Sequence, residues 1–200
     1  MRRIHALALI PFFALAACST ATTTTPTTEA PATASAPATS ASASPTTAQS
    51  TGETLSGSGY TLTLPKGWED ATEAFQKLQP QVDSGAKQTK DTSDGFNDNV
   101  NVITQASAEV PFDQLQSAIK SQLEGAGSTD IEFKENAQLD GKEALQVWSH
   151  TKGAEKAHTI QFMAFNNGNM FVVTVSTNLA DEKAAALAQQ ILGGWKWASA

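Results

Sequence analysis

A long low-complexity segment near the N-terminus confines folding to the remainder of the chain. Every residue from 19 to 52 is Ala, Ser, Thr or Pro, except Glu29, Gln49 and Gly52. The segment has no aromatic side chain and no Lys or Arg, so its burial removes too little apolar surface from water to offset the entropy of ordering it. We therefore expect a disordered tether over residues 18–54 and one globular domain over residues 55–200, which is a usual domain length.

The residues that precede the tether have the pattern of an export signal. Two arginines follow the first Met, and residues 6–17 are apolar. This apolar stretch is too short to span a bilayer as a helix, but it matches the core of a signal peptide. It ends on the single cysteine of the chain, in the order Leu15, Ala16, Ala17 and Cys18. The order resembles a bacterial lipobox and predicts a lipoprotein signal peptide over residues 1–17.

Cys18 is therefore the expected attachment point of a lipid. Sulfur is the strongest nucleophile among ordinary side chains, and the small Ala16 and Ala17 leave room for a peptidase. Stable anchoring takes two or more acyl chains, which a diacylglyceryl cysteine provides. The alternative is a plain secretory signal, which leaves an unpaired thiol in an exported protein unexplained. We expect a protein held by lipid at the outer face of the cytoplasmic membrane.

Charge and cysteine count exclude several classes of protein. The net charge is −7 and the isoelectric point is near 4.9, whereas a nucleic-acid-binding protein carries a basic patch or stripe. We therefore expect no nucleic-acid partner. One cysteine also excludes an internal disulfide framework and a cysteine-based zinc cluster.

Hydrophobic periodicity predicts six strands and three helices in the domain. Strands are expected over residues 60–64, 99–104, 131–139, 142–151, 158–166 and 170–177. Helices are expected over residues 71–78 and 111–125, and a third between an N-cap at Asn178 and Gly193. Residues 80–97 read as a long polar loop, and Asp140-Gly141 is a strong hairpin signal.

The strand patterns also predict how the sheet is arranged. Residues 160–165 and 170–175 are apolar on both parities, as in central strands that are covered on both faces. The strands at 60–64 and 131–139 are apolar on one side and belong nearer the edges. Because several consecutive links are of the hairpin type, we expect an α+β fold with a mainly antiparallel sheet of about six strands and helices on both faces.

Two short motifs carry a resemblance to a known family. Leu-Pro-Lys-Gly-Trp follows the first predicted strand at residues 64–68, and Asp-Gly-Lys-Glu-Ala forms the central hairpin at residues 140–144. Together with the lipobox and the tether, these motifs resemble the LpqN/LpqT lipoproteins of actinomycete envelopes, which have a PsbP-like fold. The resemblance implies a protein that binds partners or envelope molecules, and some relatives are linked to transport of envelope lipids. It supplies no catalytic residues.

The sequence contains none of the nucleophile-elbow, P-loop, dinucleotide-binding or zinc-protease motifs. His150 and His158 would face each other if a hairpin forms around Gly153. No carboxylate stands at a reliable ligand spacing from them, so we expect two ordinary strand histidines, no metal and no cofactor. Trp195 and Trp197 flank Lys196 on one parity. They either pack on the preceding helix or present an aromatic binding surface to a glycan or lipid.

Three functions are compatible with these observations. The first is a membrane-anchored, non-enzymatic binding or accessory lipoprotein of the cell envelope, with an envelope protein or glycolipid as its partner. The second is a carrier that encloses a lipid or small molecule in an apolar cavity. The third is an envelope hydrolase, which needs a cleft with a strongly shifted histidine or carboxylate.

Overall fold

The computed structural model describes residues 50–90, 96–151 and 157–199, in eleven strands and three helices. The signal peptide, the lipobox with Cys18 and most of the tether lie outside the described residues. The strands are β1 (Thr54–Gly57), β2 (Tyr60–Thr63), β3 (Trp68–Asp70), β4 (Val82–Gln88), β5 (Asn99–Ala106), β6 (Thr129–Phe133), β7 (Ala137–Leu139), β8 (Lys142–His150), β9 (His158–Asn166), β10 (Asn169–Thr177) and β11 (Trp195–Trp197). The helices are α1 (Thr72–Leu78), α2 (Phe112–Gly125) and α3 (Asp181–Gly193).

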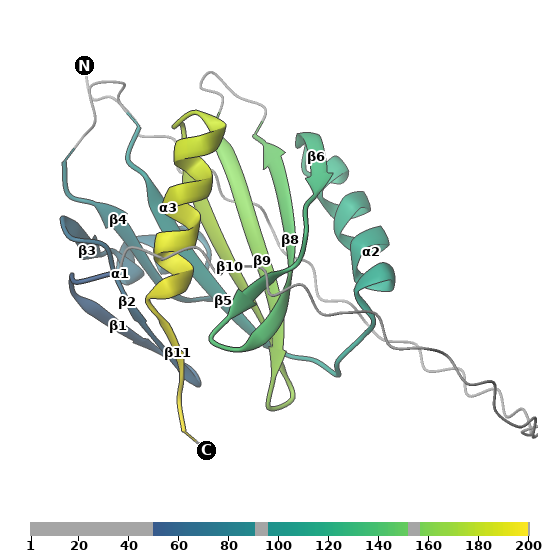
Figure 1. Cartoon of the computed structure of the whole chain (residues 1–200), viewed down its shortest axis with the longest axis horizontal. Coiled ribbons are helices and arrows are strands. Elements are labelled where there is room, and N and C mark those ends of the chain that lie inside the picture. Colours follow the sequence, from purple (N-terminus) through teal and green to yellow (C-terminus); the bar gives the residue numbers. More distant parts are fainter. Residues whose placement is uncertain (1–49, 91–95, 152–156, 200) are drawn as a thin grey trace, which may run out of the picture. The chain divides into compact units, whose positions relative to one another are not determined.

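The larger sheet has eight strands in the order β3-β4-β5-β10-β9-β8-β6, with β7 paired to β8. All of its pairings are antiparallel. The predicted α+β fold class is confirmed, and β10 and β9 hold the central places that their apolar patterns predicted (Figure 1). The predicted edge position of the strand around Ile131 is also confirmed, because β6 ends the sheet.

A second sheet of three strands, in the order β1-β2-β11, was not expected. The strand that begins at Tyr60 is the middle strand of this sheet and not an edge of the larger one. It is paired on one side with β1, in register from Thr54 to Gly57, and on the other with β11, where Trp195 lies opposite Leu62. The C-terminal Trp195-Lys196-Trp197 therefore completes a sheet as its third strand.

Three further predictions of local structure are corrected. The expected loop over residues 80–97 contains β4, which is paired to both β3 and β5. The strand expected over residues 131–139 is divided into β6 and β7, which pair with opposite halves of β8. Helix α3 has Ala180 as its N-cap without a side-chain hydrogen bond, so Asn178 does not cap it.

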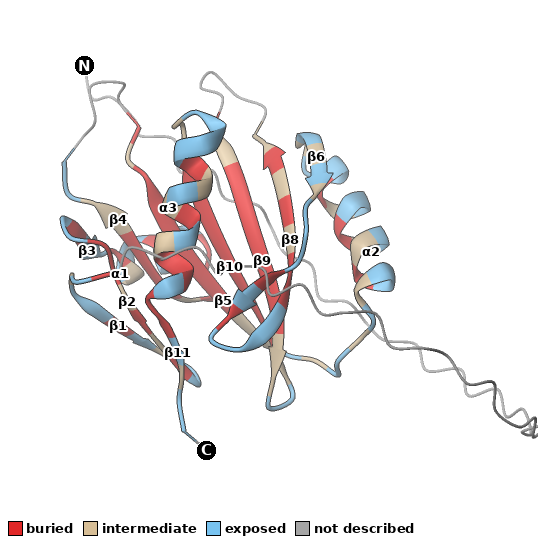
Figure 2. Ribbon diagram, viewed as in Figure 1, coloured by how far each residue is buried: buried red, intermediate tan, exposed pale blue. Residues whose placement is uncertain are grey.

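The two faces of the larger sheet pack against different elements. On one face, a core cluster joins the apolar side of β5, β10 and β9 to α3 and to the three-stranded sheet. The buried residues of α1 and α2 belong to the opposite face (Figure 2). There the Phe75 ring of α1 lies on Gly85 of β4, where an added Cβ would come within 2.5 Å of the ring. The helices therefore cover both faces, as predicted.

Two tight turns use the left-handed backbone region. Asp140 and Gly141 have φ of 46° and 82°, and Asn167 and Gly168 have φ of 48° and 72°. Positive φ at both central residues is the requirement of a two-residue hairpin turn that matches the strand twist. These turns connect β7 to β8 and β9 to β10 and so fix the register of the central strands.

Candidate functional site

The face of the larger sheet that carries α1 and α2 differs sharply from one end to the other. We call this surface the helix-flanked face, because α1 lies beside β4 and α2 beside β6, with the middle strands between them (Figure 1). At one end, a row of register partners across four strands is apolar. It consists of Ile103, Val172, Met163 and Leu145, all buried.

The next rows on the same face are polar. Thr174 of β10 is the register partner of both Asn101 and Gln161. One step further, a second row crosses four strands and consists of Asn99, Ser176, Thr159 and Ser149. All seven side chains are uncharged, and all are buried, from 0% to 6% exposed. Side chains that alternate with these along β5, β9 and β10 are the aliphatic ones of the α3 core, so the polar character belongs to one face only.

Two hydrogen-bonding atoms in the polar rows have no partner among the described residues. Gln161 donates from Nε2 to Thr174 Oγ1 over 3.4 Å, but its Oε1 and the Ser176 Oγ are buried and unpaired among the described residues. A buried polar atom without a partner costs about 1–3 kcal/mol. Such atoms on adjacent central strands therefore form an unsatisfied acceptor and hydroxyl pair that a hydrogen-bonding ligand would stabilise.

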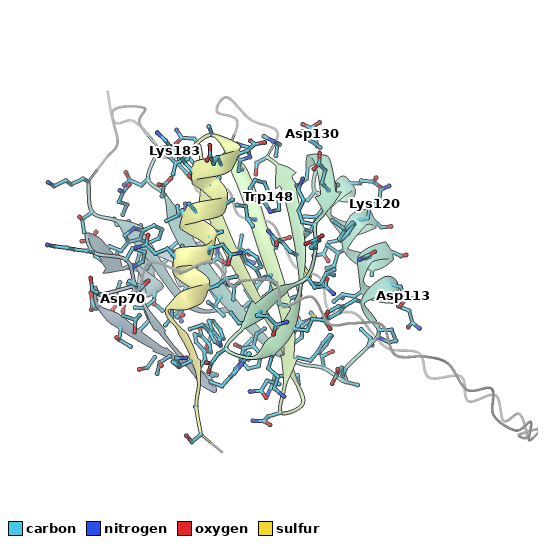
Figure 3. The ribbon with its side chains drawn as sticks, viewed as in Figure 1. Asp70, Asp113, Lys120, Asp130, Trp148 and Lys183 are labelled. Atoms are coloured by element: carbon cyan, nitrogen blue, oxygen red, sulfur yellow. The ribbon has the colours of Figure 1, made fainter. Side chains whose placement is uncertain are left out.

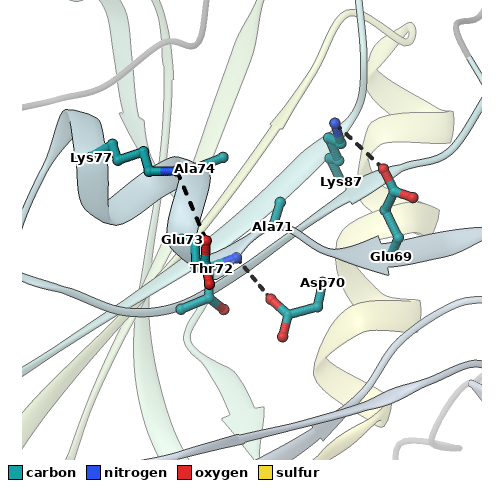
Figure 4. A pocket seen from close by; sticks show the side chains of 8 residues that line it. All are labelled: Glu69, Asp70, Ala71, Thr72, Glu73, Ala74, Lys77 and Lys87. Atoms are coloured by element: carbon teal, nitrogen blue, oxygen red, sulfur yellow. Dashed lines mark hydrogen bonds and ion pairs between the residues drawn. The ribbon is translucent and has the colours of Figure 1, made fainter.

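An open pocket of about 450 Å³ lies beside α1, at the β4 end of this face (Figure 4). Each of its two lysines is paired with a glutamate, and Asp70 accepts a backbone hydrogen bond. Lys87 Nζ is 3.4 Å from Glu69 Oε1, Lys77 Nζ is 3.8 Å from Glu73 Oε2, and Asp70 Oδ1 accepts from the Thr72 backbone N–H at 2.7 Å. Lys87 is also the register partner of Asn99. The pocket therefore lies next to the polar row that contains Asn99.

The two tryptophans of the predicted binding surface are placed differently. Trp195 is 1% exposed and stacks on Tyr60, with ring centroids 4.0 Å apart, so its role here is packing. Trp197 is only partly buried, donates from Nε1 to the Leu139 carbonyl at 2.8 Å and packs edge-on against Phe171. A contribution of Trp197 to ligand binding stays a prediction.

The structure brings His150 and His158 together as the sequence suggested. They are register partners on β8 and β9, with ring centroids 4.4 Å apart and planes tilted by 55°. His158 Nε2 is also 3.5 Å from Asp181 Oδ1 at the start of α3. Desolvation by burial, together with the nearby His150, lowers the pKa of His158, and Asp181 opposes this effect only in part.

Across the described parts of the chain, no group of three or more His, Cys, Asp or Glu side chains is arranged to hold a metal ion. Nor is any helix in those parts long and apolar enough to span a membrane.

The polar rows were missed at the level of sequence. Gln161 and Thr174 interrupt two otherwise apolar strands, and this interruption was the available signal. Its meaning depended on register, because only the pairing of β5, β10 and β9 puts Asn101, Thr174 and Gln161 side by side.

No family model and no curated protein matches the sequence, but solved structures do. PsbP from the cyanobacterium Synechocystis has a TM-score of 0.52 at 15% identity, with 79% of this chain and 99% of that one covered. The Ran-binding protein Mog1p from Saccharomyces cerevisiae has a TM-score of 0.50 at 14% identity, with 70% and 90% covered. LpqN from Mycobacterium tuberculosis, involved in cell envelope biogenesis, has a TM-score of 0.49 at 17% identity, with 70% and 83% covered.

At these identities the similarity establishes the fold alone. The chain is an α+β protein with a PsbP- and Mog1-like fold. The PsbP-like architecture predicted from the sequence is thereby confirmed.

Proposed function

We propose that this chain is a lipid-anchored, non-enzymatic protein of the cell envelope that binds an uncharged amphipathic envelope molecule, such as a glycolipid, on its helix-flanked face. In this role it would act as an accessory in envelope lipid or glycolipid transport. The observation that carries the proposal is the pair of buried polar rows next to an apolar row on the same face. The resemblance of the lipobox and tether to those of the LpqN/LpqT lipoproteins supports the location.

The chemistry of the two kinds of row matches two parts of one ligand. Asn, Gln, Ser and Thr side chains both donate and accept hydrogen bonds, whereas recognition of a phosphate or carboxylate relies on Arg or Lys. The seven uncharged side chains therefore favour a head group rich in hydroxyls. The adjoining row from Ile103 to Leu145 is apolar and buried, and it would pack against an alkyl chain once the ligand enters this face.

The anchor would place this face where such molecules are found. Lipidation at Cys18 would fix the protein to the membrane, and a flexible tether of about 35 residues has a root-mean-square span of roughly 30–35 Å. At full extension the same tether reaches on the order of 115 Å. The domain would therefore meet envelope molecules beyond the bilayer while it stays attached.

The test uses octyl glucoside below its micellar concentration as the probe and octyl phosphate as the charged comparison, in calorimetric titrations of the full chain. We expect octyl glucoside to bind more tightly than octyl phosphate. Gln161→Met keeps the side-chain length but removes the hydrogen bonds, so it should weaken octyl glucoside binding about three- to tenfold, the equivalent of one hydrogen bond. Gln138→Met, at an exposed position of β7, is the matched control and should leave binding unchanged. Failure of octyl glucoside to bind, or equal binding by both variants, would overturn the proposal.

A further inference from the structure

The facing histidines lie on the α3 side of the larger sheet, away from the helix-flanked face. The Thr151 backbone N–H donates to the Ala157 carbonyl. Thr151 and Ala157 are therefore a hydrogen-bonded pair of the antiparallel ladder. The adjacent pair, His150 and His158, is then non-hydrogen-bonded, the register in which opposite Cβ atoms approach most closely. The backbone therefore holds the two rings side by side.

Each imidazole can offer one nitrogen lone pair to a metal ion. His150 Nδ1 is buried and unpaired among the described residues. On His158 the Asp181 carboxylate lies 3.5 Å from Nε2, which stabilises a proton on that nitrogen and leaves the lone pair on Nδ1. A carboxylate on the far nitrogen of a ligating histidine is a frequent outer partner of a metal-bound imidazole.

We propose that His150 and His158 form a two-histidine site for a divalent late transition-metal ion, Cu(II) or Ni(II), with Asp181 as the outer partner of His158. The remaining coordination positions would be taken by water. This inference goes beyond the proposed function and does not depend on it, because the two sites use opposite faces of the sheet.

The separation of the rings is compatible with one class of metal ion. An ion binds imidazole nitrogen at about 2.0–2.1 Å. When both lone pairs point at one ion, ring centroids 4.4 Å apart subtend about 90° at that ion, given metal–nitrogen bonds of this length. This is the cis angle of tetragonal Cu(II) and Ni(II) sites, whereas Zn(II) prefers tetrahedral geometry. Ca(II) and Mg(II) prefer oxygen ligands and would not compete.

The fluorescence of Trp148 can report metal binding at the site. Its ring is 6.1 Å from that of His158 in an edge-on arrangement, and it lies on the same side of the sheet as α3 (Figure 3). A paramagnetic Cu(II) ion held by the two histidines would quench the fluorescence of this tryptophan.

The experiment titrates Cu(II) and Ni(II) into the full chain without an affinity tag, by calorimetry and by tryptophan fluorescence. His5 is the only other histidine, so all variants carry His5→Ala. We expect one ion per chain, with Cu(II) tighter than Ni(II). His150→Gln and His158→Gln should each weaken binding at least tenfold, and Trp148→Phe should remove most of the quenching while calorimetric binding persists.

A substitution of Asp181 distinguishes a metal site with an outer carboxylate partner from two histidines that are neighbours by chance. Asp181→Asn should weaken Cu(II) binding about tenfold, the effect of losing an outer partner. Glu182→Gln removes the same charge one residue further along α3 and should leave the affinity unchanged. If His150→Gln or His158→Gln fails to fold, the comparison of Asp181→Asn with Glu182→Gln still tests whether the histidines form a metal site. No binding by the parent chain, or equal affinity in Asp181→Asn and Glu182→Gln, would overturn the proposal.

Discussion

The indole of Trp195 stacks on the ring of Tyr60, with centroids 4.0 Å apart and planes within 9° of parallel. Tyr60 in turn shares a 2.6 Å hydrogen bond between its hydroxyl and the Ser84 hydroxyl on β4. Burial raises the pKa of the Tyr60 phenol far above its usual range, so this group stays protonated and able to donate. The C-terminal strand is thus connected through one aromatic stack to the larger sheet.

Trp195→Ala should therefore destabilise the domain as a large core truncation does. The side chain is 1% exposed, and removal of a buried aromatic side chain costs about 3–5 kcal/mol. Urea unfolding of the full chain, followed by circular dichroism, measures the change. Lys196→Ala, which loses a solvent-exposed contact to Asp140, should cost about 0–1 kcal/mol. Similar losses in the two variants would contradict the packing role of Trp195.

Gly85→Ala should destabilise the domain although it adds only one methyl group. The new Cβ would come within 2.5 Å of the Phe75 ring, and an overpacked core costs about 1–3 kcal/mol. Phe75→Leu in the same chain makes room, so the double variant should lose less than the sum of the two single changes. Strict additivity in the unfolding free energies would show that Phe75 does not rest on Gly85.

The same contact explains why β4 escaped prediction. Its sequence, Val-Asp-Ser-Gly-Ala-Lys-Gln, lacks the apolar alternation that identifies a strand. Small residues are needed there because α1 packs directly on the strand. The small residues of β4 are therefore explained by its contact with α1. The periodicity of the strand alone cannot reveal this contact.

Elements with their own strong signals were predicted closely. Strands β9 and β10 and the turn at Asn167-Gly168 follow from apolar runs and from a residue pair suited to positive φ. By contrast, β1 and β11 have four and three residues, too few to show a period, and they are strands because β2 lies between them.

The histidine pair was predictable because both residues lie in strands joined by a short connection. The polar rows needed the register of β5, which is distant in sequence from β9 and β10.

The stability of the domain should decrease as the pH falls below neutrality, in metal-free buffer. The pKa of His158 is lowered in the folded protein, whereas a histidine in the unfolded chain titrates near its ordinary pKa of 6.5. The unfolded state therefore binds the proton first, and the unfolding free energy decreases from about pH 6.5 down through the folded pKa of His158. His158→Asn should flatten this part of the profile, measured by urea unfolding with EDTA between about pH 5 and 8. A steeper profile in His158→Asn would reverse the sign of the proposed linkage.

Cys18→Ser should release the protein from the membrane fraction without changing the fold of the domain. Serine keeps the size of the side chain but its hydroxyl is a poorer nucleophile than a thiol, so the lipid would not be attached. The basic start and the apolar stretch of the signal peptide are unchanged, so the chain would still be exported. Fractionation of cells that express either form, followed by intact-mass analysis of the membrane-bound chain, measures both consequences. The parent chain should carry the mass of two or more acyl chains on a polypeptide that begins at Cys18, since fewer chains bind a bilayer only reversibly. Retention of Cys18→Ser in the membrane fraction, or a parent chain with a free thiol, would show that another part of the molecule holds it to the envelope.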